Sequence, residues 1–171
     1  MRLFFALWPA PGTAAALALW AAKAQRETGG RAARAEAIHL TLAFLGETED
    51  ARLSAAIDAA RSVRCAPHAL PIEQARHWKR QSIVWVGPNE TPAPLVALAA
   101  DLKSALMRAG FAIEARPFEA HVTLIRKARA PRALPPLPVL DWPVDEFLLV
   151  RSTLSNEGSS YTILERFPLG A

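Results

Sequence analysis

Two short stretches of this chain, HLTLAF at residues 39–44 and HVTLIR at residues 121–126, share one pattern. The element His-x-Thr-Leu therefore occurs twice, 82 positions apart (121 − 39). Because successive side chains of a β-strand alternate between two faces, His39 and Thr41 are predicted to share one face. Phe44 and the two leucines of this copy are then predicted on the opposite face. Such a strand presents an imidazole and a hydroxyl while its other face anchors in a core.

The second copy repeats this arrangement, with His121 and Thr123 together on one face. Two such strands facing each other across a cleft would place His39 and His121 on either side of one bound group. Cleavage of a phosphodiester needs a base that activates the nucleophile and an acid that protonates the departing oxygen. Two histidines with a pKa of about 6.5 supply both at neutral pH, and the threonines can donate hydrogen bonds to phosphate oxygens. This chemistry needs no metal, and neither motif has a His, Asp or Glu set at metal-ligand spacing.

The composition is that of a soluble globular protein, with 171 residues, 51% hydrophobic and 21% charged. The net charge is +4, and sixteen arginines stand against four lysines. The arginine fork matches phosphate oxygens in pairs, so this excess suits a polyanionic partner, although for the composition alone we favour codon bias as its cause. Cys65 is the only cysteine, which excludes an intramolecular disulfide and fits a cytoplasmic location. Pro9 and Pro11 interrupt the apolar N-terminal stretch, and no run reaches the ~20 apolar residues of a membrane span.

Predicted strands and helices are mixed along the chain. Frequent neighbouring strands favour antiparallel sheets with helices on their outer faces, an α+β fold. The repeated motif predicts two related lobes with a central cleft, within one continuous domain of residues 1–171. Strands are predicted at residues 2–8, 37–45, 69–75, 82–86, 118–125, 146–153 and 160–167, and helices at residues 13–27 (capped by Thr13), 48–63 and 92–109, with the proline-rich residues 131–143 as a loop or edge connection.

The sequence around the two motifs resembles a known family. RLFFAL near the N-terminus, IHLTLAFLGE around His39, RPFEAHVTLIRK around His121, and Tyr161 together look like the two-histidine (2H) phosphoesterase superfamily. The resemblance is strongest to its bacterial RNA 2′,3′-cyclic phosphodiesterases, also called 2′-5′ RNA ligases, and runs from Arg2 to about Leu164. It implies a two-lobed, pseudo-symmetric fold and a monomeric enzyme without cofactor. It also implies hydrolysis of RNA 2′,3′-cyclic phosphate ends, such as those of tRNA fragments, to 2′-phosphates.

The resemblance also implies roles for individual residues. His39 and Thr41 match the first family motif, and His121 and Thr123 match the second. We interpret His39 as the base that activates water and His121 as the acid that protonates ribose O3′, with the reverse assignment open. Arg126 matches the arginine that closes the second motif, a candidate phosphate clamp. Strict alternation places Arg126 on the face opposite the motif histidine, so it reaches the cleft only if the strand ends or bulges just before it.

Other residues have two interpretations. Tyr161 contacts substrate or fills a core edge, and we favour the core edge. Phe5 and Phe44 are expected in the core rather than as platforms for a nucleobase. The stretch RHWKR at residues 76–80 is suited to an RNA backbone and a stacked base, or is a solvated hairpin turn. His68 and His77 have no partner motif and are expected at the surface, and Cys65 has no matching histidine for a nucleophilic role.

Two alternatives to this enzyme remain open. One is a non-catalytic RNA-end binding protein in which the histidines only hold phosphate. The other is a 2H phosphodiesterase that acts on 2′-5′ oligonucleotides or on small cyclic nucleotides. The presence of both histidines favours an enzyme, because a binding module has no need for an acid and a base together. Reverse 2′-5′ ligation is implied by the family name, and mass action makes it the minor direction in water.

Overall fold

The computed structural model describes residues 1–170, which fold into three antiparallel sheets. The first sheet has the strand order β10-β9-β1-β3, the second β2-β7-β6-β5, and a small sheet pairs β4 with β8. The strands are β1 (Arg2–Leu7), β2 (Arg31–Ala32), β3 (Leu40–Glu47), β4 (His68–Ile72), β5 (Gln74–Trp78), β6 (Ile83–Gly87), β7 (Val122–Arg126), β8 (Leu140–Val144), β9 (Glu146–Ser155) and β10 (Gly158–Pro168). The helices are α1 (Pro11–Thr28), α2 (Leu53–Arg61) and α3 (Ala93–Arg108), with 3₁₀ turns at Ala35–Ala37 and Asp50–Arg52.

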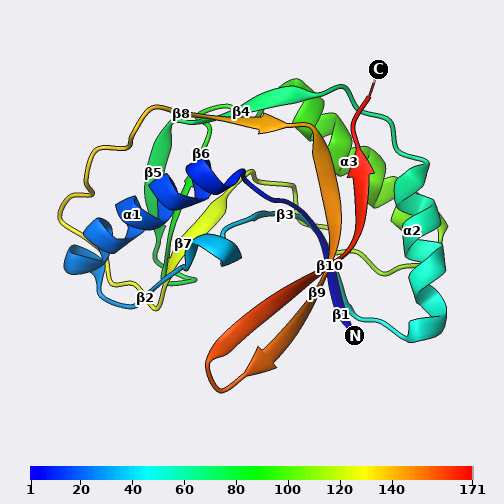
Figure 1. Cartoon of the computed structure of the whole chain (residues 1–171), viewed down its shortest axis with the longest axis horizontal. Coiled ribbons are helices and arrows are strands. Elements are labelled where there is room, and N and C mark those ends of the chain that lie inside the picture. The colour runs from blue at the N-terminus through cyan, green and yellow to red at the C-terminus, as the bar shows by residue number, and fades with distance from the viewer. Residues whose placement is uncertain (171) are drawn as a thin grey trace.

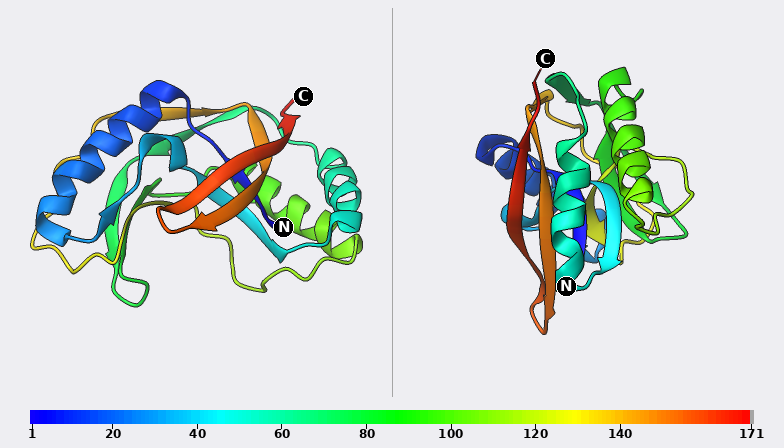
Figure 2. Two further views of the ribbon diagram at one scale, coloured as in Figure 1. Left: turned by 60° about the horizontal axis from the view of Figure 1, so that its bottom comes forward. Right: turned by 90° about the vertical axis from the view of Figure 1, so that its right-hand side faces the viewer.

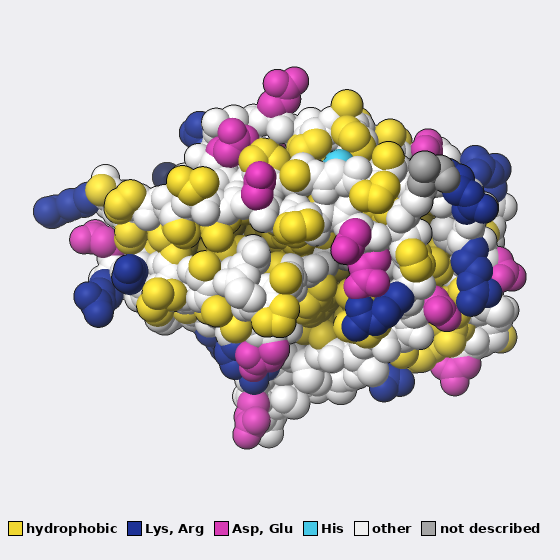
Figure 3. Space-filling model, turned by 45° about the horizontal axis from the view of Figure 1, so that its top comes forward, with side chains coloured by type: hydrophobic (Ala, Val, Ile, Leu, Met, Phe, Trp, Pro, Cys, Tyr) yellow, Lys and Arg dark blue, Asp and Glu magenta, His cyan; other side chains and the backbone are white. Residues whose placement is uncertain are grey.

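The molecule has two lobes, as the motif repeat predicts. Figure 1 shows α1 beside β5, β6 and β7 on the left, and α2 and α3 beside the first sheet on the right. Figure 2 shows the helices of the two lobes at opposite ends of the molecule. The predicted α+β class with antiparallel sheets and outer helices is confirmed. From the side that carries β4 and β8, the middle of the surface is largely apolar, and Lys and Arg side chains gather toward its two ends (Figure 3).

The two lobes exchange helices. Helix α1 follows β1 of the first sheet but packs against β2 and β7 of the second sheet. Helix α3 follows β6 of the second sheet but packs against β3 of the first sheet and against α2. Each helix that precedes a motif strand therefore covers the other motif strand. The two strands that carry the motifs, β3 and β7, also contact each other.

The N-terminal strand β1 is buried on both faces, which explains its continuous apolar sequence RLFFAL. Leu3, Phe5 and Leu7 point into the main core, which both lobes share. Phe4 and Ala6 point to the other face and pack in a smaller apolar cluster with two residues of β9. Partly buried aromatic side chains of Trp8 and Tyr161 border this smaller cluster. One strand thus links the main core to a second, aromatic surface.

Two helix starts differ from the prediction. Helix α1 begins at Pro11, and Thr13 does not cap it. Proline fits the first helical turn because its missing N–H has no partner there in any helix. The helix predicted at residues 48–63 is divided into a 3₁₀ turn at Asp50–Arg52 and α2, which begins at Leu53. Among residues 1–170, no helix combines the length and the hydropathy that crossing a membrane requires.

Two strand predictions also differ. The strand predicted at residues 69–75 is two strands, because β4 pairs with β8 in the small sheet whereas β5 pairs with β6 in the second sheet. The proline-rich passage at residues 131–143 ends in β8, where Pro143 lies opposite Ala69 in an isolated two-stranded pairing that tolerates proline. His39 and His121 each lie one residue before a strand rather than within it, since β3 begins at Leu40 and β7 at Val122.

Candidate active site

The ring of His39 is enclosed by three aromatic side chains. The indole of Trp8 lies nearly parallel to it, with ring centroids 4.7 Å apart and 13° between the planes. The ring of Phe4 lies 5.1 Å away, and Tyr161 presents its ring edge-on at 5.1 Å. Phe4 belongs to the smaller apolar cluster on this face of the first sheet. The enclosure holds the imidazole in one orientation and removes water from it.

The protonation state of His39 follows from this setting. Its Nδ1 donates to the backbone carbonyl of Ala37 at 2.7 Å. A carbonyl only accepts, so Nδ1 carries the proton and Nε2 is left with a lone pair in the neutral ring. The pKa of His39 is lowered to about 4, mainly by burial and to a smaller extent by the positive charges of Arg126 and His121, against the raising effect of the Ala37 hydrogen bond. His39 is therefore neutral at pH 7.

The second histidine has a matching setting in the other lobe. Nδ1 of His121 donates to the carbonyl of Glu119 at 2.9 Å, two residues earlier in the chain, as for His39. Trp78 and Trp85 flank its ring at centroid distances of 4.8 and 6.2 Å. Both imidazoles thus use Nδ1 for the backbone and leave Nε2 for a third group. The strands that carry the two motifs, β3 and β7, contact each other, and the charge of His121 lowers the pKa of His39, so the two rings border one site.

Each motif strand carries a β-bulge at the same place in the repeat. In the pairing of β3 with β1, Thr41 and Ala43 have partners and Leu42 has none. In the pairing of β7 with β6, Thr123 and Ile125 have partners and Leu124 has none. The bulged residue and the next one are therefore both buried, and alternation resumes one position late. Residues after the bulge are on the face opposite to that predicted by strict alternation.

Arg126 is brought to the side of the motif histidine by this bulge. It pairs with Ile83, two residues before Trp85, and Trp85 pairs with Thr123 and contacts His121. Residues two apart in a strand share a face, so Arg126 lies on the face of Trp85 and Thr123. The bulge that the sequence analysis required for Arg126 is present. Arg126 is exposed, and its charge lowers the pKa of His39 in the other lobe.

Phe44 lies at the position of the first motif that corresponds to Arg126, and the prediction that it is a core residue is wrong. Its side chain is 59% exposed, whereas Phe5 is fully buried as predicted. Phe44 pairs with Phe4, and their rings lie 6.0 Å apart, on the face that also carries His39. An exposed phenyl ring therefore stands beside the site.

The two motif threonines lie on the same strands as these residues. Thr41 and Thr123 are half-buried on β3 and β7, each two residues beyond its histidine. Tyr161 borders the smaller apolar cluster, in agreement with the core-edge interpretation, and also contacts the rings of His39 and Trp8. The structure thus brings together residues from both lobes that the sequence separates widely.

Sequence reasoning did not find three aromatic residues of the site in this role. The sequence places Trp8 only at the end of a predicted strand, and Trp85 lies inside a strand without a motif. Trp78 belongs to the basic stretch at residues 76–80, and nothing in that stretch predicts its contact with His121. The one signal available for Trp8 is its position, because it is an aromatic residue that ends a strand of buried residues.

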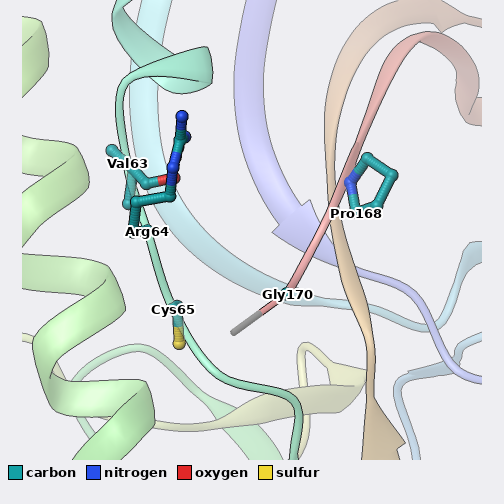
Figure 4. A pocket seen from close by; sticks show the side chains of 5 residues that line it. All are labelled: Val63, Arg64, Cys65, Pro168 and Gly170. Carbon is teal, nitrogen blue, oxygen red and sulfur yellow. The ribbon is translucent and has the colours of Figure 1, made fainter.

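The other candidates lie away from both motif histidines. His68 and His77, expected at the surface, are half-buried and bond the carbonyls of Ala66 and Ala128. Cys65 lines a hollow of about 190 Å³ whose wall contains no histidine (Figure 4). Burial, and the charge of Asp101, raise the pKa of the Cys65 thiol, which disfavours the reactive thiolate. Residues 1–170 hold no group of three or more His, Cys, Asp or Glu placed to bind a metal ion.

Comparisons with known proteins agree with this geometry. The sequence model of the family described as LigT like Phosphoesterase matches the chain twice in succession, over residues 7–85 and 86–161, and each match contains one motif. The RNA 2′,3′-cyclic phosphodiesterase of Escherichia coli K12 is 35% identical over 170 residues, 98% of this chain and 96% of the relative. The enzyme of the same name from Thermus thermophilus is 34% identical over 179 residues, 99% and 90% of the two chains. The crystal structure of E. coli LigT complexed with 3′-AMP matches with a TM-score of 0.91 at 34% identity, covering 99% of this chain and 98% of that one.

Proposed function

The chain belongs to the LigT-like phosphoesterases, and from that premise we propose that it hydrolyses RNA 2′,3′-cyclic phosphate ends to 2′-phosphates. The acid and the base of this reaction are the imidazoles of His39 and His121. The observation that carries the proposal is their matched setting. Each ring donates Nδ1–H to a carbonyl two residues earlier and keeps Nε2 for the substrate, in a site bordered by both.

In the proposed reaction a water molecule attacks the phosphorus atom of the cyclic phosphate. Its proton passes to Nε2 of His39 as the new phosphorus–oxygen bond forms. The bond between phosphorus and ribose O3′ breaks, and O3′ takes a proton from Nε2 of His121. The products are a 2′-phosphate and a free 3′-hydroxyl. Each proton transfer contributes on the order of 10²–10⁴ in rate.

The assignment of His39 as the base is supported by its low pKa. A base must be unprotonated when the substrate arrives, and burial keeps His39 neutral at every pH well above 4. His121, which borders the site from the other lobe, is then the acid that protonates O3′. The anionic substrate between the two rings favours the charged form of both histidines, which helps His39 to keep the proton it takes from water.

The remaining motif residues are proposed to hold the phosphate. Thr41 and Thr123 donate their hydroxyl protons to the two non-bridging oxygens, where negative charge increases in the transition state. From the rim of the site, Arg126 donates hydrogen bonds to one of these oxygens or to the ribose, and its guanidinium suits both. Because the bulge at Leu124 turns Arg126 to this side, its position supports the role.

The choice of substrate is supported by the relatives. Four curated relatives at 30–35% identity are named RNA 2′,3′-cyclic phosphodiesterase, and E. coli LigT was crystallised with 3′-AMP, a ribonucleotide. We propose that the 171 residues act as one unit, a cytoplasmic monomer, on RNA ends such as those of tRNA fragments. A 5′-hydroxyl in place of water would give a 2′-5′ linkage through the same proton transfers, as a minor reaction.

The test is product analysis on a short RNA that ends in a 2′,3′-cyclic phosphate, in EDTA. The wild type is compared with His39→Ala, His121→Ala and His68→Ala. His68 is the matched control because its Nδ1 also bonds a carbonyl two residues earlier, but it lies in the small sheet. We expect a 2′-phosphate product from the wild type and from His68→Ala, and a loss of at least about 10²-fold in each motif variant.

Two results would contradict the proposal. Activity in either motif variant equal to that of His68→Ala would make the repeated motif a structural element. Tight binding of the cyclic-phosphate RNA without any product, at long times, would make the protein an RNA-end binding protein.

A further inference from the structure

Seven basic side chains of the second-sheet lobe lie on two neighbouring segments next to the candidate site. The segments are residues 76–80 and 126–132, which contain no Asp or Glu. All seven side chains are exposed. We call this surface the basic ridge; its members are Arg76, Lys79, Arg80, Arg126, Lys127, Arg129 and Arg132. The loop between β7 and β8, which carries Arg129 and Arg132, forms part of the left edge of Figure 1, and Figure 3 shows both basic and acidic side chains at the left end of the molecule.

Hydrogen bonds join the two segments of the basic ridge. Nε2 of His77 donates to the carbonyl of Ala128 at 3.0 Å, and the N–H of Ala128 donates to the carbonyl of Ser82 at 2.8 Å. The N–H of Arg129 donates to the carbonyl of Thr28 at the end of α1, at 2.9 Å. The β5–β6 turn, the loop after β7 and the end of α1 therefore form one fixed surface.

The charges of the basic ridge are not neutralised within the protein. Within residues 1–170, none of its seven members forms an ion pair, whereas Arg34, Arg116 and Arg166 each pair with a glutamate. Seven neighbouring cations without a carboxylate repel one another and attract a polyanion. A surface whose positive charges form no ion pairs suits a partner that carries several regularly spaced negative charges.

A groove runs along the basic ridge between the outer strand β5 and the loop that follows β7. Its volume is about 390 Å³, within the range of about 300–1,000 Å³ that small-molecule sites occupy. Arg76 lines the groove from β5 and Arg132 from the loop, and apolar side chains such as Pro131 and Leu134 also line it. Apolar side chains beside two guanidinium groups suit a nucleobase flanked by its phosphates.

The basic ridge continues directly from the candidate site along both of its strands. On β5, Trp78 contacts the ring of His121 and is followed by Lys79 and Arg80. On β7, Arg126 ends the motif strand, affects the pKa of His39 and is followed by Lys127. The basic ridge therefore begins at residues that directly follow contacts of the candidate site on both strands.

We propose that the basic ridge and its groove bind the RNA strand that precedes the terminal cyclic phosphate. The preferred substrate is then a single-stranded oligonucleotide rather than a cyclic mononucleotide. This inference rests on the proposed function for the position of the RNA end, and it adds a binding subsite outside the His-x-Thr motifs.

The ridge variant is Arg76→Gln with Arg132→Gln, which removes one guanidinium from each segment that lines the groove. The matched control is Lys103→Gln with Arg108→Gln on α3, which removes the same charge from the other lobe. Affinity is measured by fluorescence anisotropy with a ten-nucleotide RNA that ends in a 2′-phosphate, at several salt concentrations. The values of kcat/KM are measured for a ten-nucleotide RNA with a cyclic phosphate end and for 2′,3′-cyclic AMP.

We expect the ridge variant to bind the ten-nucleotide RNA about tenfold more weakly and to lose about 1.4 from its log–log salt slope, as two lost phosphate contacts on single-stranded RNA require. The ratio of kcat/KM for the RNA to that for 2′,3′-cyclic AMP falls about tenfold, and the control differs from the wild type by less than about twofold. Equal affinity and equal salt slopes for the ridge variant and the control would overturn the inference.

The two proposals fail in distinguishable ways. A wild type that turns over neither substrate contradicts the proposed function, while a ridge-dependent RNA affinity would still support the ridge. A wild type that cleaves 2′,3′-cyclic AMP and the ten-nucleotide RNA with equal kcat/KM supports the proposed function and overturns the inference about the ridge.

Binding to vesicles of phosphatidylserine and phosphatidylcholine tests whether the ridge instead binds a membrane, which is another polyanion. If the ridge variant loses vesicle binding but keeps its RNA affinity, the ridge binds membranes and the inference is wrong.

Discussion

The imidazole of His39 lies nearly parallel to the indole of Trp8, with ring centroids 4.7 Å apart and 13° between the planes. The indole covers one whole face of the imidazole, so water cannot solvate a positive charge from that side. Burial is the largest cause of the low pKa of His39. Trp8, which follows β1 and belongs to neither motif, thus helps to lower the pKa of His39.

Replacement of Trp8 by alanine should raise the pKa of His39 from about 4 toward 6.5, because it opens one face of the ring to water. The pKa can be followed by NMR titration of the ring protons. Trp78→Ala is the control, since Trp78 contacts His121 and not His39. If both variants shift the pKa of His39 equally, the effect is not caused by the stacked indole.

The same pKa predicts the acidic limb of the pH–rate profile. If His39 is the base, kcat/KM should fall on the acidic side only near pH 4, since the free enzyme protonates its base there. The measurement is kcat/KM on a cyclic-phosphate RNA between pH 3.5 and 8. An acidic limb near the ordinary histidine pKa of about 6.5 would contradict the assignment of His39 as the base.

The stability of the protein should decrease below pH 6.5 because of His39. Above pH 6.5 the ring is neutral in the folded and the unfolded chain, so it adds no pH dependence. Between 6.5 and about 4 the unfolded chain binds a proton that the folded chain does not, so the free energy of unfolding decreases as the pH falls. The decrease should be about 2 kcal/mol between pH 6.5 and 5, at about 1.36 kcal/mol per unit. Urea unfolding of the wild type and His39→Gln tests this, because the variant should lack that decrease.

The two phenylalanines Phe5 and Phe44 should respond in opposite ways to truncation. Phe5→Ala should cost about 3–5 kcal/mol of the free energy of unfolding, because Phe5 is fully buried in the main core. Phe44→Ala should cost less than about 1 kcal/mol, because its ring is exposed. It should nevertheless lower kcat/KM on RNA, since a phenyl ring beside the site can stack a base for about 1–3 kcal/mol. An unchanged kcat/KM for Phe44→Ala would show that the ring does not contact substrate.

Gly30 should tolerate no side chain. Its φ is +78°, and a Cβ there would clash with the carbonyl oxygen of Arg126. Gly30→Ala should therefore cost more than about 2 kcal/mol of the free energy of unfolding and lower kcat/KM by displacing Arg126. Gly12→Ala is the matched control, because its Cβ would meet no atom within 4 Å and alanine favours the helix. Equal stability of the two variants would show that the chain near Arg126 relaxes freely.

The sequence predicts the α+β class and most strands because the apolar patterns are long and turn residues separate them. It fails at Phe44 because a bulge inserts one unpaired residue, and Leu42 looks in sequence like any other core leucine. Trp8 could not be assigned to the site because its contact with His39 depends on how β1 and β3 pair. The strand predicted at residues 69–75 divides at Glu73 because its two parts pair with strands that are far apart in the chain.

The exchange of helices between the lobes makes the two halves of the chain mutually dependent. Either half of the chain alone would carry one His-x-Thr strand whose covering helix belongs to the other half. A cut between the halves would therefore leave each motif strand without its covering helix, and each half with one motif histidine. The topology is that of a domain-swapped dimer contained in a single polypeptide.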